Sequence, residues 1–178
     1  MPSNADLWGW RSSETRSEDG AVESKQQVWV TQPVVQTNET GARELGLRYW
    51  QEVRRATRGL VRVRISGTGV QIRVAGHGPA VLRFAPAQVG VEADAVTCVY
   101  AITGGLLSRE PTGTITFRQL QLADRVQLES AIAGFHPTLA ARPGAPDWTG
   151  ELYKHVQARI HVGISGDYFR RLAETAQR

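Results

Sequence analysis

Four histidines and a single cysteine are the side chains of this 178-residue chain that are best suited to catalysis or metal binding. His155 and His161 are six residues apart, whereas two metal ligands on one helical face need a spacing of about four residues. His77 lies between two glycines, which predicts an exposed turn. The sequence contains no metal or cofactor motif, and we expect neither group.

Cys98 and His136 come nearest to a nucleophile with its base, because an imidazole can take the proton of a thiol. Nothing in their spacing supports that role, and a buried cysteine is more often a small apolar core residue. If the protein catalyses a reaction, we expect general acid–base chemistry by His136 and Tyr100. The sequence favours a binding protein over an enzyme, and we predict no catalytic residue.

The first 25 residues differ in composition from the rest of the chain. Residues 11–25 are polar with hardly any apolar side chain, which predicts disorder. Trp8 and Trp10 precede this stretch, and tryptophans in a polar segment either pack on the protein's own surface or anchor a partner. We interpret residues 1–25 as a disordered or partner-docking tail, through which a protein partner or a second copy would bind, and residues 26–178 as a single domain.

The sequence predicts a cytoplasmic protein. Its start has no basic segment followed by an apolar run, so we expect no secretory signal. No stretch approaches the roughly eighteen apolar residues of a transmembrane helix. The single Cys98 excludes a disulfide within the chain, which fits a reducing compartment.

One strand and one helix precede a long alternating region. Residues 27–36 are rich in valine, which predicts a strand, and Pro33 favours an edge or a bend there. Asn38 or Thr40 can cap a following helix that Gly59 would end. Its apolar residues recur on one face, with Trp50 at the margin: Ala42, Leu45, Tyr49, Val53 and Ala56.

Residues 60–85 alternate between apolar and polar side chains, which predicts three antiparallel strands. A two-residue turn of type II′ at Gly67-Thr68 pairs Ile65 with Val70 and Val63 with Ile72. If residues 76–78 form a three-residue loop, the third strand pairs Val74 with Ala80, Ile72 with Leu82 and Val70 with Phe84.

Arginines occupy the outward positions of these strands: Arg62, Arg64, Arg73 and Arg83. The register puts Arg62 opposite Arg73, and such like-charged pairs need solvent, a carboxylate or a bound anion. No aromatic side chains alternate with the arginines for base stacking, which argues against nucleic acid. We therefore expect a solvated face or a protein interface.

Further strands are predicted over residues 89–92, 95–102, 113–119 and 124–136, followed by a linker at residues 138–147. Residues 149–178 then predict one long helix. Gly163 lies within its apolar stripe and Gly166 follows one turn on, and each lowers helix stability by about 1 kcal/mol relative to alanine. We expect a kink or break near residues 163–166.

This order of strand, helix, six or seven antiparallel strands and long C-terminal helix resembles the helix-grip fold of the START-related (SRPBCC) superfamily. The resemblance covers about 150 residues and rests on element order alone. It implies an α+β fold in which a curved sheet wraps round the last helix. The alternatives are a lipocalin-like β-barrel with a flanking helix and a cone-shaped α+β fold.

The resemblance also implies a cavity between sheet and helix for a hydrophobic small molecule such as a lipid, a polyketide or a quinone-like compound. We then expect a non-catalytic binding module. The alternative function is an accessory subunit of a larger assembly, anchored by its tryptophan-containing tail and its arginine-rich face. The residues that we expect to line the cavity are Phe84, Cys98, Tyr100, Phe117, Gln119, Ser130, His136, Tyr153, Ile160 and Gly163. Alternatively, Tyr100, Gln119 and Ser130 are part of a solid core or lie at the ends of the sheet.

Overall fold

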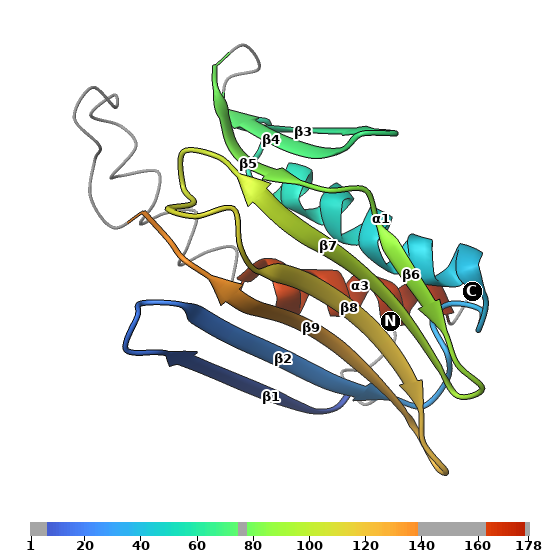
Figure 1. Cartoon of the computed structure of the whole chain (residues 1–178). Helices are drawn as coiled ribbons and strands as arrows, with labels where there is room; N and C mark the ends of the chain where they lie inside the picture. The colour runs from blue at the N-terminus through green and yellow to red at the C-terminus, as the bar shows by residue number, and fades with distance from the viewer. Residues whose placement is uncertain (1–6, 75–77, 139–162, 177–178) are drawn as a thin grey trace.

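A computed structural model describes residues 7–74, 78–138 and 163–176, which form an α+β fold (Figure 1). Its described helices are α1 (Glu39–Ala56) and α3 (Ser165–Ala176). Its described strands form one antiparallel sheet: β1 (Leu7–Arg16), β2 (Val22–Val30), β3 (Val61–Ser66), β4 (Gly69–Val74), β5 (Ala80–Phe84), β6 (Gln88–Val91), β7 (Ala95–Gly104), β8 (Thr114–Gln121) and β9 (Val126–Phe135).

The described strands lie in the order β1-β2-β9-β8-β7-β5-β4-β3, with β6 paired to β7 off this path. Both helices cover one face of the sheet, which we call the inner face (Figure 1). The sheet is open, with β1 and β3 at its ends, so the barrel alternative is wrong. The sheet has nine described strands rather than six or seven, and β1 is the strand that the sequence analysis did not predict.

The polar N-terminal segment forms strands instead of the expected disorder. β1 pairs with β2, and β2 pairs with β9, so residues 7–25 belong to the sheet. Inward and outward residues alternate along β2, but two inward positions hold Ser24 and Gln26, which makes the segment polar in composition. The predicted strand over residues 27–36 ends at Val30, and the proposed boundary at residue 25 falls inside β2.

Helix α1 follows the prediction closely. The Asn38 side chain accepts a hydrogen bond of 2.8 Å from the Gly41 amide and caps the first turn. The predicted apolar face is buried, and Trp50, expected at its margin, is also only 1% exposed. Arg58 and Gly59 follow the helix with φ angles of 49° and 82°, so the left-handed backbone begins one residue before the predicted stop.

The predicted register of β3, β4 and β5 is largely confirmed. Val63 pairs with Ile72 and Arg62 with Arg73, while Val70 pairs with Phe84 and Ile72 with Leu82. A register shift between Ile72 and Arg73 then pairs Arg73, rather than Val74, with Ala80.

The β3–β4 turn has the predicted length but not the predicted type. A type II′ turn needs a positive φ angle at Gly67, whereas the positive angle of 123° lies at Gly69. A Cβ atom at Gly69 would lie 2.0 Å from the Phe84 carbonyl oxygen, so close strand packing requires the glycine.

The C-terminal helix is described from Ser165 onward, and its Tyr168, Phe169 and Leu172 are buried. Residues 139–162, which contain most of the predicted linker and the first part of the predicted long helix, lie outside the described residues. The kink near residues 163–166 therefore stays a prediction. Within the described part of the chain, no helix combines the length and the hydropathy that crossing a membrane requires.

Candidate functional site

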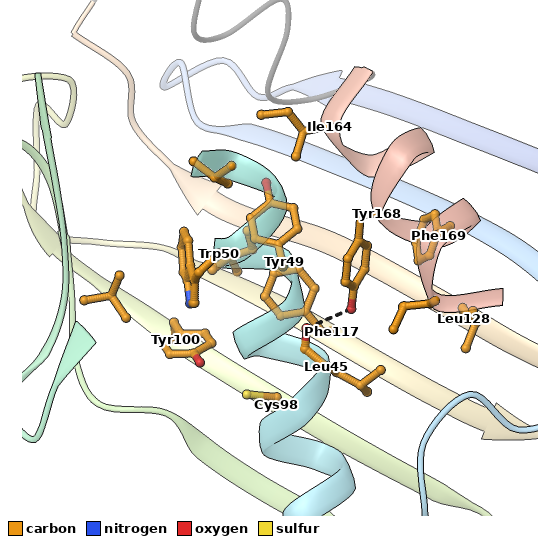
Figure 2. Close-up of a cluster of buried hydrophobic side chains, with 14 of the residues drawn as sticks. Leu45, Tyr49, Trp50, Cys98, Tyr100, Phe117, Leu128, Ile164, Tyr168 and Phe169 are labelled. Carbon is orange, nitrogen blue, oxygen red and sulfur yellow. Dashed lines mark hydrogen bonds between the residues drawn. The ribbon is translucent and has the colours of Figure 1, made fainter. Parts of the chain in front are cut away.

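Four of the predicted cavity residues belong to an aromatic core that α1 and α3 complete (Figure 2). The Trp50 ring of α1 lies 5.0 Å from the Phe84 ring and 5.3 Å from the Tyr100 ring, between centroids. The Tyr49 ring lies 4.5 Å from that of Phe117, which also contacts Tyr168 of α3. In the described structure, the rings of Phe84, Tyr100 and Phe117 therefore pack against other core side chains, as does the fully buried Cys98.

Gly46 lets α1 approach β7 closely enough to bury Cys98 and Tyr100. A Cβ atom at this position would lie 2.6 Å from the Tyr100 hydroxyl oxygen and 2.9 Å from Cys98 Sγ. Burial raises the pKa of the Cys98 thiol and that of the Tyr100 hydroxyl, because it disfavours their charged forms. Both groups are neutral near pH 7, which does not suit Cys98 as a nucleophile.

Gln119 fastens the chain between β2 and α1. Its side-chain oxygen accepts hydrogen bonds of 2.8 Å from the Val34 amide and 3.1 Å from the Val35 amide. Its side-chain nitrogen donates one of 2.9 Å to the Val35 carbonyl oxygen. These three bonds hold the buried amide, so its evident role is to satisfy main-chain groups that have no strand partner.

His136 lies at the end of β9 in a partly exposed group of polar side chains. Its Nδ1 atom is 3.0 Å from Thr112 Oγ1, and its Nε2 atom is 3.2 Å from Asp19 Oδ2 in the β1–β2 turn. Hydrogen bonds from the Ser17 hydroxyl, the Ala21 amide and His136 lower the pKa of Asp19. In the described structure His136 makes no hydrogen bond to Tyr100, the acid–base partner that the sequence suggested.

Four buried polar residues form a second group on the inner face, below the start of α3. We call Ser24, Gln26, Ser130 and Ser165 the inner polar cluster; each is at most 3% exposed. The Gln26 side-chain nitrogen donates a hydrogen bond of 2.6 Å to Ser24 Oγ. Ser165 Oγ donates one of 3.5 Å to Gln26 Oε1, and Ser130 pairs with Gln26 across the strands.

Of this cluster, the sequence analysis singled out only Ser130. The alternation of polar residues in β2 was the signal that could have identified Ser24 and Gln26 as inward. Tyr153 and Ile160 lie outside the described residues. Gly163, two residues before Ser165, is exposed, and no described atom beyond its chain neighbours and its own helix lies within 4 Å of the place where its Cβ would be.

The predicted partner-binding residues occupy two separate places. The Trp10 ring lies edge-on to Phe169 of α3, 5.8 Å between centroids, yet 45% of the residue stays exposed. The side chain of Trp8 lies outside the described part. Arg62, Arg64 and Arg83 are exposed, while Arg73 donates to the Gln71 side chain and to the Gly78 carbonyl oxygen.

The linings of two clefts between described residues contain no predicted cavity residue. One of about 390 Å³ lies between α1 and α3, and one of about 720 Å³ lies beside residues 33–44. Among the residues that the structure describes, no group of three or more His, Cys, Asp or Glu side chains could hold a metal ion.

No protein-family model matches the sequence, and no curated protein sequence matches it. Two solved structures of CalU16 from Micromonospora echinospora are similar to this chain. The crystal structure is 12% identical, with 93% of this chain and 91% of that chain covered and a TM-score of 0.32. The solution NMR structure is also 12% identical, with 99% and 98% covered and the same TM-score. A similarity at this level does not establish a shared fold, ligand or activity.

Proposed function

We propose that this protein binds a hydrophobic small molecule on the inner face, between the sheet and the C-terminal helix, without catalysing a reaction. The observation that carries the proposal is the inner polar cluster. Small-molecule sites combine apolar walls with a few convergent polar groups. In the inner polar cluster, three hydroxyl groups and one amide converge in a region where each residue is at most 3% exposed, which fits that description.

The order of the elements supports a helix-grip architecture for this site. The strand before α1, β2, pairs with β9, the last described strand, and the C-terminal helix contacts β2. In such an arrangement the sheet can wrap round the last helix. The aromatic core fills the region below α1, which leaves the region around the inner polar cluster and Gly163 as the proposed site.

The chemistry of the inner polar cluster favours a neutral ligand. It offers hydroxyl groups and one amide but no charged side chain, so a hydrogen-bonding carbonyl or hydroxyl on an apolar body fits it best. A lipid, a polyketide or a quinone-like compound has this character. Tyr153, Ile160 and Gly163 are the residues of the C-terminal segment that we propose as the facing wall.

Native mass spectrometry tests the proposal. The chain, purified without denaturation, should carry a small molecule that organic solvent extracts and that adds to its mass of 19.5 kDa. The Ser130→Leu variant should show no additional mass from a bound molecule. The Ser13→Leu variant, with the same change at an exposed position of β1, should still show it. Unfolding midpoints show that both variants are folded. A wild-type chain with no bound mass, which also binds no added neutral hydrophobic compound, would contradict the proposal.

A second function, that of an accessory subunit in an assembly, is favoured by the exposure of Trp10 beside Phe169. Deleting residues 1–25 cannot test it, because that change removes β1 and part of β2. Trp10→Ser and the double variant Arg62→Glu/Arg83→Glu leave the strands in place. If the function is correct, native mass spectra of the chain purified from its own cells contain a stoichiometric protein partner, and these variants lose it.

A further inference from the structure

The cleft between α1 and α3 combines apolar and cationic walls, and the sequence did not suggest it. Its volume is about 390 Å³, and none of its described lining residues belongs to the inner polar cluster. Two leucines, Leu47 and Leu172, lie beside three arginines. The described lining residues are Glu44, Leu47, Arg48, Gln51, Glu52, Arg55, Tyr168, Arg171, Leu172 and Thr175.

A buried carboxylate orients two of these arginines. Glu52 is only 3% exposed, and its Oε2 atom lies 3.3 Å from Arg55 Nη1 on α1 and 2.9 Å from Arg171 Nε on α3. Arg48 pairs with Glu44 one turn earlier on α1. Because each guanidinium is already held, an anion that binds to it meets a lower cost in side-chain entropy.

The guanidinium groups of this cleft have further N–H donors, and the cleft lining has a net positive charge. A guanidinium has five N–H groups, and in the described structure Arg55 and Arg171 each direct one nitrogen at Glu52. Three arginines against Glu44 and Glu52 leave the lining with a net charge of +1 (3 − 2). One added carboxylate would neutralise this charge, and a planar carboxylate matches the fork of a guanidinium.

We propose that this cleft binds a small organic carboxylate with an apolar body. The carboxylate contacts the free guanidinium nitrogens of Arg55 and Arg171, and the apolar body lies over Leu47 and Leu172. The site is distinct from the one proposed on the inner face, since it is cationic and its described lining comes from α1 and α3 without any residue of the inner polar cluster. A neutral hydrophobic compound should therefore prefer the inner face.

Titration of the full-length protein with octanoate, followed by NMR of the backbone amides, tests the proposal. Octanoate binding should be saturable and should change the amide chemical shifts of α1 and α3 residues around the cleft. Octanamide, its neutral counterpart, should bind at least tenfold more weakly. Raising the ionic strength should weaken octanoate binding, because salt screens the charge. Equal binding of the two compounds, or octanoate shifts confined to the inner polar cluster, would overturn the proposal.

Two substitutions separate anion binding from the structural role of the ion pairs. Arg171→Lys keeps a positive charge beside Glu52 but removes the guanidinium fork, so octanoate affinity should fall at least tenfold. Arg48→Gln, whose partner Glu44 is 39% exposed, provides a second variant with less effect on folding. Arg43→Lys, on α1 outside the cleft and paired with Glu39, is the matched control and should bind normally. Unchanged affinity in the folded cleft variants would overturn the proposal.

Discussion

Tyr168 of α3 donates a hydrogen bond of 3.0 Å to the main-chain carbonyl oxygen of Leu45 in α1 (Figure 2). The Tyr168 ring also lies edge-on to Tyr49, 5.5 Å between centroids. The pair of Arg171 with Glu52 links the same two helices. These contacts hold α1 and α3 together, so they position the residues that line the cleft between the two helices, and they fix the helix that carries Ser165 of the inner polar cluster.

Tyr168→Phe should lower the free energy of unfolding by about 1 kcal/mol, since it removes one buried hydrogen bond and keeps the ring. Tyr168→Leu should cost about 2–4 kcal/mol, because the ring contacts with Tyr49, Phe117 and Phe169 are also lost. Urea unfolding measures both values. Equal losses for the two variants would show that the ring contributes nothing beyond its hydroxyl.

Gly46→Ala should destabilise the protein by roughly 1–3 kcal/mol, because the added methyl group meets Tyr100 and Cys98 at less than contact distance. Helix propensity alone predicts the opposite sign, a gain of up to about 1 kcal/mol. Gly166→Ala in α3 is the matched control: its Cβ would meet no described atom outside its own helix within 4 Å, so the free energy of unfolding should stay the same or rise. Thermal or urea unfolding decides between the two signs, and a stabilised Gly46→Ala protein would refute the close approach of α1 to β7.

Gln119→Met should cost about 2–4 kcal/mol of unfolding free energy, since it leaves the buried main-chain groups of Val34 and Val35 without partners. Gln121→Met makes the same change two residues later, at an exposed position on β8, and should stay within about 0.5 kcal/mol of the parent protein. Similar effects of the two substitutions would show that Gln119 does not fasten the β2–α1 connection.

The Asp19 carboxyl should titrate below its ordinary pKa of 3.8 in the folded protein. Because the folded pKa is lowered, Asp19 stabilises the β1–β2 turn above pH 3.8, and this contribution is lost as the pH falls toward the folded value. Carboxyl-detected NMR measures the titration. Ser17→Ala should raise the Asp19 pKa more than His136→Gln does, because the Ser17 hydroxyl is the largest cause of the shift; the reverse order would contradict this assignment.

The parts of the fold that the sequence predicted are those in which burial and apolar composition coincide. The alternation of valine and isoleucine in residues 60–75 gave the register of β3 and β4, and the spacing of Leu45, Tyr49 and Val53 gave the buried face of α1. The start of β2 was not predicted because Ser24 and Gln26 occupy inward positions that are usually apolar. β1 was not predicted because its residues 9–16 are exposed and mostly polar.

The site was harder to predict than the fold, because its features depend on contacts between distant segments. Periodicity placed Gln119 on the inner face but could not show that Val34 and Val35 would take its hydrogen bonds. Arg55 and Arg171 both form ion pairs with Glu52. The second pair depends on the packing of α1 against α3, which no local sequence pattern predicts. The ligand-binding role of the predicted cavity residues remains a proposal.

Amide NMR with a neutral hydrophobic probe, N-phenyl-1-naphthylamine, tests the central claim most directly. If the inner face binds hydrophobic molecules, the probe should cause saturable shifts at Ser24, Gln26, Ser130 and Ser165, and Ser130→Leu should abolish them. The amides around Arg55 and Arg171 should change little, since that cleft favours an anion. Absence of saturable shifts in the inner polar cluster, or shifts confined to other surfaces, would contradict the account.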